Sequence, residues 1–307
     1  MITTNTITKF AALAGMVLTF GIQSQAMTCI NYGADITDDS GLTNIAQENG
    51  ITKGTLYGLN GGESIQDVIN TCYDTPDNPV TIILGAGDYD SFSMINATKA
   101  KRYINIIGSD KKEVTITDDS GRYDSPAAEI YTDGIIKNIK FVSTLKNLTE
   151  STDSLPAYAV HLDYGQVVTE FDNCDFIAYN APAVGIGLTD GTKITFKDCL
   201  MKLFLDSHTE TMFECINALY CHTSQFENNA SNQFLELYNC TIDAQSSNGF
   251  AMVLQELNGN NATLVSVDSN YLSVYKNPIV FGGFKIAEQS AGNNVDVLNT
   301  GTGVSIP

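Results

Sequence analysis

The chain has 307 residues, with 35 acidic and 16 basic side chains, and its formal net charge is −19. This excess of acid argues against nucleic acids and anionic membrane surfaces as partners, because binding to both depends on Lys and Arg contacts to phosphate groups. Charged residues make up only 17% of the chain and hydrophobic residues 43%, a composition that favours folding over disorder.

The first 26 residues have two interpretations, which the sequence leaves open. Lys9 is followed by uncharged, mostly apolar residues from Phe10 to Ile22 and then by Ser24-Gln25-Ala26. This pattern is typical of a secretory signal peptide that is cleaved after Ala26. The alternative, which we favour, is a retained apolar arm that docks on a partner. The segment is too short to span a bilayer comfortably, and no later segment is a transmembrane candidate.

After a mixed, turn-rich region from residue 27 to about 60, the sequence predicts one amphipathic helix. Ser64 is suited to the N-cap position, and Ile65, Val68, Ile69 and Cys72 follow at the spacing of one helix face. The polar segment 74–79, which contains two prolines, ends this pattern. We expect the helix to close the open end of the domain that follows it.

From residue 80 onward, short β-rich segments are bounded by Gly, Asn, Asp and Ser. A local phrase with a central Asn or Asp recurs between them. Its copies are Lys137–Phe141, Asp172–Phe176, Lys197–Met201 and Tyr238–Ile242. Asp268–Leu272 is a fifth, poor copy, because in this frame it lacks the central Asn or Asp and the apolar residue after it.

Strands of a second type alternate with these phrases. They are Tyr158–Leu162, Val184–Leu188, Ala218–His222, Phe250–Leu254 and Pro278–Phe281. Two alternating families of strands with a period of about 20 to 50 residues indicate a solenoid, in which each coil gives one strand to each of several parallel sheets. The predicted fold class is all-β, a right-handed parallel β-helix with an N-terminal capping helix.

The cysteines of the repeated phrase are expected in the core. Cys174, Cys199 and Cys240 occupy the same place in successive copies, and free cysteine packs as a small apolar group. We predict an inward column of free thiols rather than disulfides or metal ligands. Along the chain we predict an N-terminal arm or signal peptide (1–26), an attachment or cap region (27–62), the β-helix (63–290) and a C-terminal tail (291–307).

Several segments, taken in order, carry a resemblance to a known family. They are Ser64–Ile69, Thr81–Leu84, Gly87–Tyr89, Asn105–Gly108, Asp133–Phe141, Tyr158–Leu162 and Phe171–Phe176. Their order resembles the pectin methylesterase branch of the pectin-lyase-like β-helix proteins over roughly residues 62 to 245. Tyr158–Leu162 lies at the position of the family's Q-A-V-A-L motif, and Phe171–Phe176 at that of the F-x-N-C-x-F strand.

The resemblance implies an esterase mechanism whose residues are largely missing here. In the family, one Asp attacks the ester, a second Asp acts as acid and base, an Arg orients the nucleophile, and the Gln of Q-A-V-A-L helps to form the oxyanion hole. The Gln position here is Tyr158, the acid position is Ala181, and Asp206 is the only match, at the nucleophile position. The only arginines, Arg102 and Arg122, leave the downstream Arg motif without a counterpart. We therefore expect no catalytic residues and no methylesterase activity.

Metal and cofactor chemistry is not expected either. Pectate lyases of similar fold use calcium held by clustered carboxylates, together with an Arg or Lys base. The acidic pairs of this chain, Asp118-Asp119, Asp88/Asp90 and Asp172/Asp175, are explained more simply as turn-forming residues. None of the seven cysteines forms a C-x-x-C motif, which argues against a zinc site.

One outer face of the solenoid is a candidate glycan groove. Alternation along Tyr158–Asp163 points His161 and Asp163 outward if Val160 and Leu162 face the core, and a later coil would expose Tyr220 and His222 in the same way. Glycines at 185 and 187 would leave a flat strip between them. His161, Asp163, Tyr220 and His222 are therefore the glycan-binding candidates. The alternative is an ordinary solvated polar face.

Three functions follow from these observations. We favour a non-catalytic β-helix protein of a phage virion (tail spike, fibre or head decoration), because degenerate pectin-lyase-like β-helices recur there and Ala157–His161 and Ala218–His222 resemble phage-encoded β-helix proteins. Such a protein would lie on the virion surface as a homotrimer, attach to other virion proteins through its N-terminal region and contact a neutral host glycan. The alternatives are a secreted bacterial pectinesterase-like protein that binds or processes carbohydrate, and a structural surface protein without a ligand.

Overall fold

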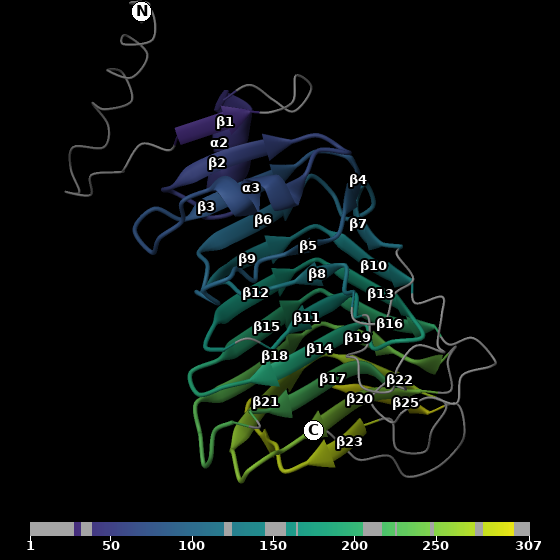
Figure 1. The fold of residues 1–307 in the computed structure, drawn as a ribbon. Coiled ribbons are helices and arrows are strands. Elements are labelled where there is room, and N and C mark those ends of the chain that lie inside the picture. Colours follow the sequence, from purple (N-terminus) through teal and green to yellow (C-terminus); the bar gives the residue numbers. More distant parts are fainter. Residues whose placement is uncertain are drawn as a thin grey trace, which may run out of the picture.

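The computed structural model of the chain describes residues 28–31, 39–119, 125–144, 158–163, 165–204, 217–224, 226–245, 249–273 and 279–297. In this part of the chain, almost all regular structure belongs to three parallel sheets that surround one core (Figure 1). From β3 to β23 the chain passes from sheet A to sheet B to sheet C and returns to sheet A, so each of these coils adds one strand to each sheet. The predicted all-β, parallel β-helical architecture is confirmed.

Sheet A has ten strands in the described residues. They are β1 (Thr28–Asn31), β2 (Thr55–Leu59), β3 (Val80–Leu84), β6 (Ile104–Gly108), β9 (Gly134–Lys137), β12 (Val168–Asp172), β15 (Lys193–Lys197), β18 (Gln233–Tyr238), β21 (Ala262–Val267) and β24 (Lys285–Ile286).

Sheet B has eight described strands. They are β4 (Gly87–Asp90), β7 (Val114–Asp118), β10 (Lys140–Thr144), β13 (Asp175–Tyr179), β16 (Leu200–Phe204), β19 (Thr241–Asp243), β22 (Asn270–Ser273) and β25 (Asn294–Val297).

Sheet C has seven described strands and contains the second family of strands predicted from the sequence. They are β5 (Phe92–Ser93), β8 (Ala128–Glu129), β11 (Val160–Leu162), β14 (Val184–Leu188), β17 (Asn217–Thr223), β20 (Phe250–Gln255) and β23 (Ile279–Gly282).

The repeated phrase marks the corner at which the chain turns from sheet A to sheet B. Its central residue has a left-handed backbone conformation in every copy, with φ between 51° and 58°. These residues are Asn138, Asn173, Asp198, Asn239 and Asp268. Asn and Asp tolerate this conformation better than other residues with a Cβ, which explains why they recur there. Their side chains also bond between coils, because the Asn173 amide donates to Asn138 Oδ1 at 2.8 Å and the Asn239 amide to Asp198 Oδ1 at 2.5 Å.

The fifth copy of the phrase is regular, and the frame expected for it is wrong by one residue. Asp268 is the left-handed corner residue, Ser269 stands in the place of the cysteine, and Tyr271 is the buried apolar residue that follows. The repeat therefore extends from Val267 to Tyr271. The correct frame is difficult to recognise in the sequence, because the last copy has serine where three earlier copies have cysteine.

Aromatic rings and thiols fill the core at these corners. Phe171 and Phe196 are stacked with centroids 4.9 Å apart, and Phe176 meets the Phe196 ring edge-on at 5.7 Å. The predicted column of Cys174, Cys199 and Cys240 is confirmed, with all three thiols buried and free. Each thiol lies within hydrogen-bonding distance of a carbonyl oxygen of the preceding coil, at Ile136, Phe171 and Phe196 respectively.

The predicted capping helix is α3 (Ile65–Thr71), with Ser64 as its N-cap accepting a hydrogen bond from the Asp67 amide. It lies between β2 and β3, where later coils place strands of sheets B and C, and it buries Ile65, Val68 and Ile69 in the main core. The helix thus covers the N-terminal end of the hydrophobic interior, as expected.

A second helix, α2 (Asp39–Glu48), was not predicted from the sequence. Its Leu42 and Ala46 pack with Leu56, Ile83 and Ile107, which point outward from sheet A, and form a small separate core. The described helices are thus ten and seven residues long, and neither is long and apolar enough to cross a membrane. In the described residues, sheet A begins with β1 and sheet B extends to β25. The predicted division of the chain into arm, cap region, β-helix and tail stays a prediction.

Phe196 provides a test of this packing. It is fully buried and contacts Phe171 and Phe176 of the preceding coil, so Phe196→Ala is expected to lower the free energy of unfolding by about 3–5 kcal/mol, through lost contacts and the cavity left behind. The matched control is Phe226→Ala, because the Phe226 side chain is 87% exposed. In urea unfolding, Phe226→Ala is expected to change the free energy of unfolding by less than about 0.5 kcal/mol. Equal effects of the two substitutions would contradict the assigned core.

Candidate functional site

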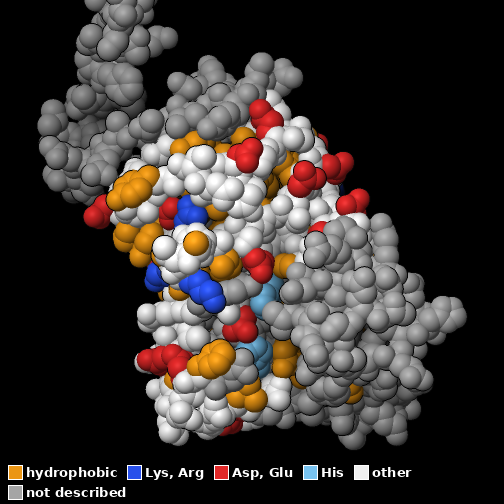
Figure 2. Space-filling view, in the orientation of Figure 1, with side chains coloured by type: hydrophobic (Ala, Val, Ile, Leu, Met, Phe, Trp, Pro, Cys, Tyr) orange, Lys and Arg blue, Asp and Glu red, His pale blue; other side chains and the backbone are white. Residues whose placement is uncertain are grey.

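The candidate residues lie on the outer face of sheet C, on strands β11 and β17 and just after β11. The strand register aligns His161 with Gly185 and Tyr220, and it aligns Gly187 with His222. The intervening residues, such as Leu162 and Cys221, belong to the buried core. The structure therefore places the four candidates on one outer face of sheet C, in the predicted alignment. In Figure 2 the histidine side chains, in pale blue, lie beside acidic side chains on this face.

Asp163 and His222 form an ion pair that spans two coils. Asp163 follows β11, and its Oδ2 lies 3.4 Å from Nε2 of His222 on β17. The other ring nitrogen, Nδ1, lies 2.8 Å from the Thr223 carbonyl oxygen. Burial by itself would lower the pKa of His222, but the Asp163 carboxylate and the Thr223 carbonyl outweigh burial and raise this pKa above its ordinary value. Both ring nitrogens face acceptors, which favours the imidazolium form.

His161 has a different environment although it lies on the same face. Its ring is stacked on that of Tyr158, with centroids 4.9 Å apart and planes within 8°. Burial lowers the pKa of His161, and the carboxylates of Asp163 and Glu129 offset only part of this effect. As the pH falls, His222 therefore takes up its proton before His161 does.

The glycines between these residues are covered rather than forming an open strip. A Cβ atom at Gly187 would collide with the Asp163 carboxylate, and one at Gly185 would collide with the Tyr158 ring. Glycine at both positions therefore lets side chains from the preceding coil lie flat across β14. The prediction of an open, flat strip at Gly185 and Gly187 is therefore wrong, because the side chains of Tyr158 and Asp163 cover these glycines.

Two candidates are also less accessible than expected. His161 is 6% exposed and Tyr220 is 9% exposed, although both point away from the core. The accessible groups are the Asp163 side chain, which is 32% exposed, and Gln255 on β20, which accepts a 2.7 Å hydrogen bond from the Tyr220 hydroxyl. Gln255 was missed from the sequence, although extending the register of His222 by one more coil identifies it.

Only one of the positions implied by the esterase resemblance is described on this face, the oxyanion position. Tyr158, at the oxyanion glutamine position, is stacked on His161, and Ala181, at the acid position, is completely buried before β14. Asp206, at the nucleophile position, and Arg122 lie outside the described residues. Arg102 is bound to Asp74 near α3. Whether the four candidates bind a glycan stays a prediction.

The arrangement suits hydrogen bonding to hydroxyl-rich ligands. Asp163 and the Gln255 carbonyl supply acceptors, and the Gln255 amide supplies a donor. Both nitrogens of the His222 ring are already bonded to the protein, and the rings of Tyr158 and Tyr220 are buried and support these polar groups from below. Within the described ranges, no group of three His, Cys, Asp or Glu side chains is arranged to hold a metal ion.

The Asp163–His222 pair makes the stability of the fold depend on pH. Because the folded-state pKa of His222 lies above its ordinary value of 6.5, its contribution is complete below pH 6.5 and is lost as the pH rises through the folded-state pKa. Asp163→Asn is expected to lower the pKa of His222 in an NMR titration. The difference in unfolding free energy between wild type and variant should be larger at about pH 6 than at about pH 8.5.

Asp88→Asn is the control for this experiment, because it removes the same charge from an exposed position on β4 in sheet B. It should leave the pKa of His222 unchanged. An equal shift in both variants would mean that overall charge, and not the pair, determines the titration.

No family model and no curated protein matches the chain. Among solved structures, it is similar to a pectin methylesterase from carrot, with a TM-score of 0.47 and 11% identity over 81% of this chain and 82% of that one. It is also similar to a pectin methylesterase from Aspergillus niger, with a TM-score of 0.42 and 15% identity over 81% and 90% of the two chains. A third structure, ORF18 of Geobacillus virus E2, gives a TM-score of 0.35 and 11% identity over 85% and 65%. These likenesses concern the course of the chain, and no residue role is taken from them.

Proposed function

We propose that this protein is a non-catalytic β-helix of a phage virion (a tail spike, fibre or head decoration) that contacts neutral host surface glycans through the outer face of sheet C. It acts as a homotrimer on the virion surface and attaches to other virion proteins through its N-terminal region.

The observation that carries the proposal is the chemistry of the sheet C face. The acid position of the esterase resemblance is a buried alanine, Ala181, and the oxyanion position is an aromatic ring, Tyr158, stacked on His161. The polar groups that remain, Asp163 and His222, are bound to each other. A face built in this way offers accessible hydrogen-bonding groups on a rigid sheet, which suits recognition of a ligand better than its hydrolysis.

The charge distribution favours a neutral glycan. The chain carries a net charge of −19, and the described residues of the face include the carboxylates of Asp163 and Glu129. A polyuronate would have to approach this field without a cluster of basic side chains to hold its carboxylates. Neutral hydroxyl groups meet no such barrier and can bond to both the acceptors and the donors of the face.

The virion assignment is supported by the sequence and by the nature of the fold. Degenerate pectin-lyase-like β-helices recur in phage spikes, fibres and head decorations, as the sequence resemblance implies. Continuous coil-to-coil pairing, as in sheets A, B and C, leaves few open backbone groups and gives an extended surface for contacts.

A second candidate is a secreted bacterial protein that binds carbohydrate through the same face. The specific observation in its favour is the apolar segment from Phe10 to Ile22 followed by Ala26, which has the pattern of a signal peptide. The N-terminal residue of the natural protein separates the two candidates. Met1 or Ile2 supports the virion protein, and Met27 supports the secreted one.

The non-catalytic part of the proposal has a direct assay. Incubation of the protein with methylated pectin is expected to release no methanol above a buffer control, because the acid and oxyanion positions carry Ala181 and Tyr158. Asp206→Ala, which removes the only carboxylate that matches the family's nucleophile, should behave identically. Methanol release by the wild type that disappears in Asp206→Ala would show the protein to be an esterase.

The binding part is tested with a panel of neutral and acidic bacterial surface glycans. The wild type is expected to bind a neutral glycan, and the double variant Asp163→Asn/Gln255→Ala to bind it at least about tenfold more weakly, because it loses accessible polar groups of the face.

The proposed homotrimer is tested by light scattering on the same samples, which should give three times the 33.1 kDa mass of the chain.

The matched control is Asp172→Asn/Gln47→Ala, which makes the same two chemical changes on sheet A and on α2. It should bind like the wild type. Absence of binding to every glycan, or equal losses in the two double variants, would refute contact through sheet C.

A further inference from the structure

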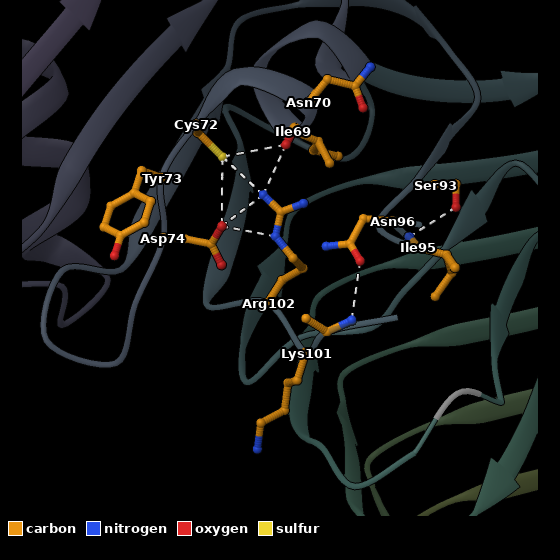
Figure 3. Close-up of a pocket in the computed structure, with 11 residues that line it drawn as sticks. Ile69, Asn70, Cys72, Tyr73, Asp74, Ser93, Ile95, Asn96, Lys101 and Arg102 are labelled. Carbon is orange, nitrogen blue, oxygen red and sulfur yellow. Dashed lines mark hydrogen bonds and ion pairs between the residues drawn. The ribbon is translucent and has the colours of Figure 1, made fainter. Parts of the chain in front are cut away.

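A polar cavity of about 300 Å³ lies away from the candidate face residues, at the N-terminal end of the solenoid (Figure 3). The C-terminal part of α3 forms one side, and the segment between β5 and β6 forms the other. The side chains that matter here are Asn70, Ser93, Asn96 and Arg102, with Ile95 and Tyr73 beside them. Neither the esterase resemblance nor the proposed function assigns a role to this place.

Arg102 is the fixed centre of the cavity. It is 8% exposed, its Nε donates to Asp74 Oδ1 at 2.9 Å, and its Nη2 donates to the Ile69 carbonyl at 2.9 Å. These bonds hold the guanidinium plane against α3. The remaining nitrogen, Nη1, bonds to no described residue and points away from this network in Figure 3. A rigid, buried guanidinium group therefore presents unused N–H donors at the cavity.

The neighbouring amide of Asn96 is oriented as a second donor. Its Oδ1 accepts hydrogen bonds from the Thr98 amide, the Thr98 hydroxyl and the Ala100 amide, at 2.7–3.1 Å. Because backbone N–H groups can only donate, this pattern fixes which amide atom is oxygen, and Nδ2 is left to donate.

Asn70 and Ser93 add donors of the same kind. The Asn70 Oδ1 accepts from the Gln66 amide at 2.9 Å, so its own NH₂ group is available. Ser93 Oγ accepts from the Ile95 amide at 3.1 Å, which leaves the hydroxyl hydrogen to point elsewhere. The cavity thus collects donors from four side chains.

The carboxylate and carbonyl oxygens around the cavity each already accept a hydrogen bond from the protein. Asp74 Oδ1 accepts from Arg102, and Asp74 Oδ2 accepts from the Tyr103 amide at 2.6 Å. The Ile69 carbonyl accepts from Arg102, and the Ser93 carbonyl accepts from Gln66. The group that best complements a cluster of unused donors around a guanidinium is an oxyanion, because its oxygens only accept and its charge strengthens each hydrogen bond.

We propose that this cavity binds an oxyanion group, the carboxylate of a sugar acid or a phosphate, with Arg102 and Asn96 as its principal donors. The partly buried Ile95 and the Tyr73 ring, which is 81% exposed, give the carbon skeleton of such a ligand an apolar surface. The charge of Arg102 is balanced by Asp74 and that of Lys101 by Asp133. The affinity is therefore expected to be modest, with a dissociation constant on the order of 1 mM.

The cavity has a defined relation to the candidate face. Ser93 on β5 is in register with Glu129 on β8, which is in register with His161 on β11. Ser93 and His161 are therefore two strand spacings apart, which corresponds to about 10 Å between their backbones. A ligand that extends along sheet C could therefore reach both places, but the oxyanion site itself does not depend on the proposed function.

The test uses glucuronate, inorganic phosphate and glucose as probes, titrated into the full-length protein and followed by NMR. Glucuronate and phosphate are expected to bind, and glucose is not. Tighter binding of glucuronate than of phosphate identifies a sugar acid as the preferred source of the oxyanion, and the reverse identifies a phosphorylated ligand; either order supports the site.

Asn96→Asp is the decisive variant. An aspartate keeps the Oδ1 that accepts the three local hydrogen bonds, but it replaces the free NH₂ group with negative charge. Binding of both acids should weaken at least tenfold. Arg102→Lys, which keeps the charge and removes Nη1, should weaken binding as well, but it also disturbs the bonds to α3. The fold-preserving Asn96→Asp therefore decides the question.

The control is Asn294→Asp, which adds the same charge on β25 at the opposite end of the solenoid. It should leave binding unchanged. Failure of both acids to bind the wild type, equal binding of glucose and glucuronate, or equal weakening in Asn294→Asp would overturn the proposal. None of these results bears on glycan recognition by the Asp163 and Gln255 region, which is measured with separate variants.

Discussion

The left-handed corner between sheets A and B is the constraint on which the rest of the molecule depends. At Asn138, Asn173 and their equivalents, one residue with φ near 55° turns the chain from sheet A into sheet B, and side-chain amides bond from one coil to the next. The corner fixes which residue begins each strand of sheet B, and therefore which side chains point inward along the coil. A slip of one residue would turn the buried phenylalanines out to solvent. The outward positions of His161 and His222 are set by the coil-to-coil register of sheet C.

This constraint also explains how much the sequence could predict. Few residue types tolerate the corner, and a buried residue follows it in each copy, so the phrase repeats visibly in the chain. The fifth copy was misframed because Ser269 replaces the cysteine, and α2 was missed because only Leu42 and Ala46 mark its buried face over a short, turn-like stretch. The alignment of the four candidates was predictable from alternation. Their burial was not, because the position of Tyr158 over Gly185 and of Asp163 over Gly187 depends on side-chain direction between coils, which spacing does not encode.

The distribution of charge has a similar origin. Several lysines are paired with acids of an adjacent coil, including Lys137 with Asp172, Lys197 with Glu170 and Lys202 with Asp243. Surface pairs of this kind stabilise a fold by at most about 1 kcal/mol each. Their larger effect is to occupy basic groups, so the acidic excess remains the dominant long-range field around the molecule. The cavity at Arg102 is compatible with this field because its donors act at short range, on a ligand already in contact.

The passage of the chain through sheets A, B and C in strict rotation has an evolutionary consequence. Each turn is bounded by the same corner and is held only by the turns above and below it, so a whole turn is a unit that gene duplication can add or delete in frame. Every added turn would lengthen the molecule by about 4.8 Å while leaving the helical cap at the N-terminal end and the lateral face intact. A lineage carrying this fold can therefore adjust its reach in fixed steps, independently of changes in what its surface recognises.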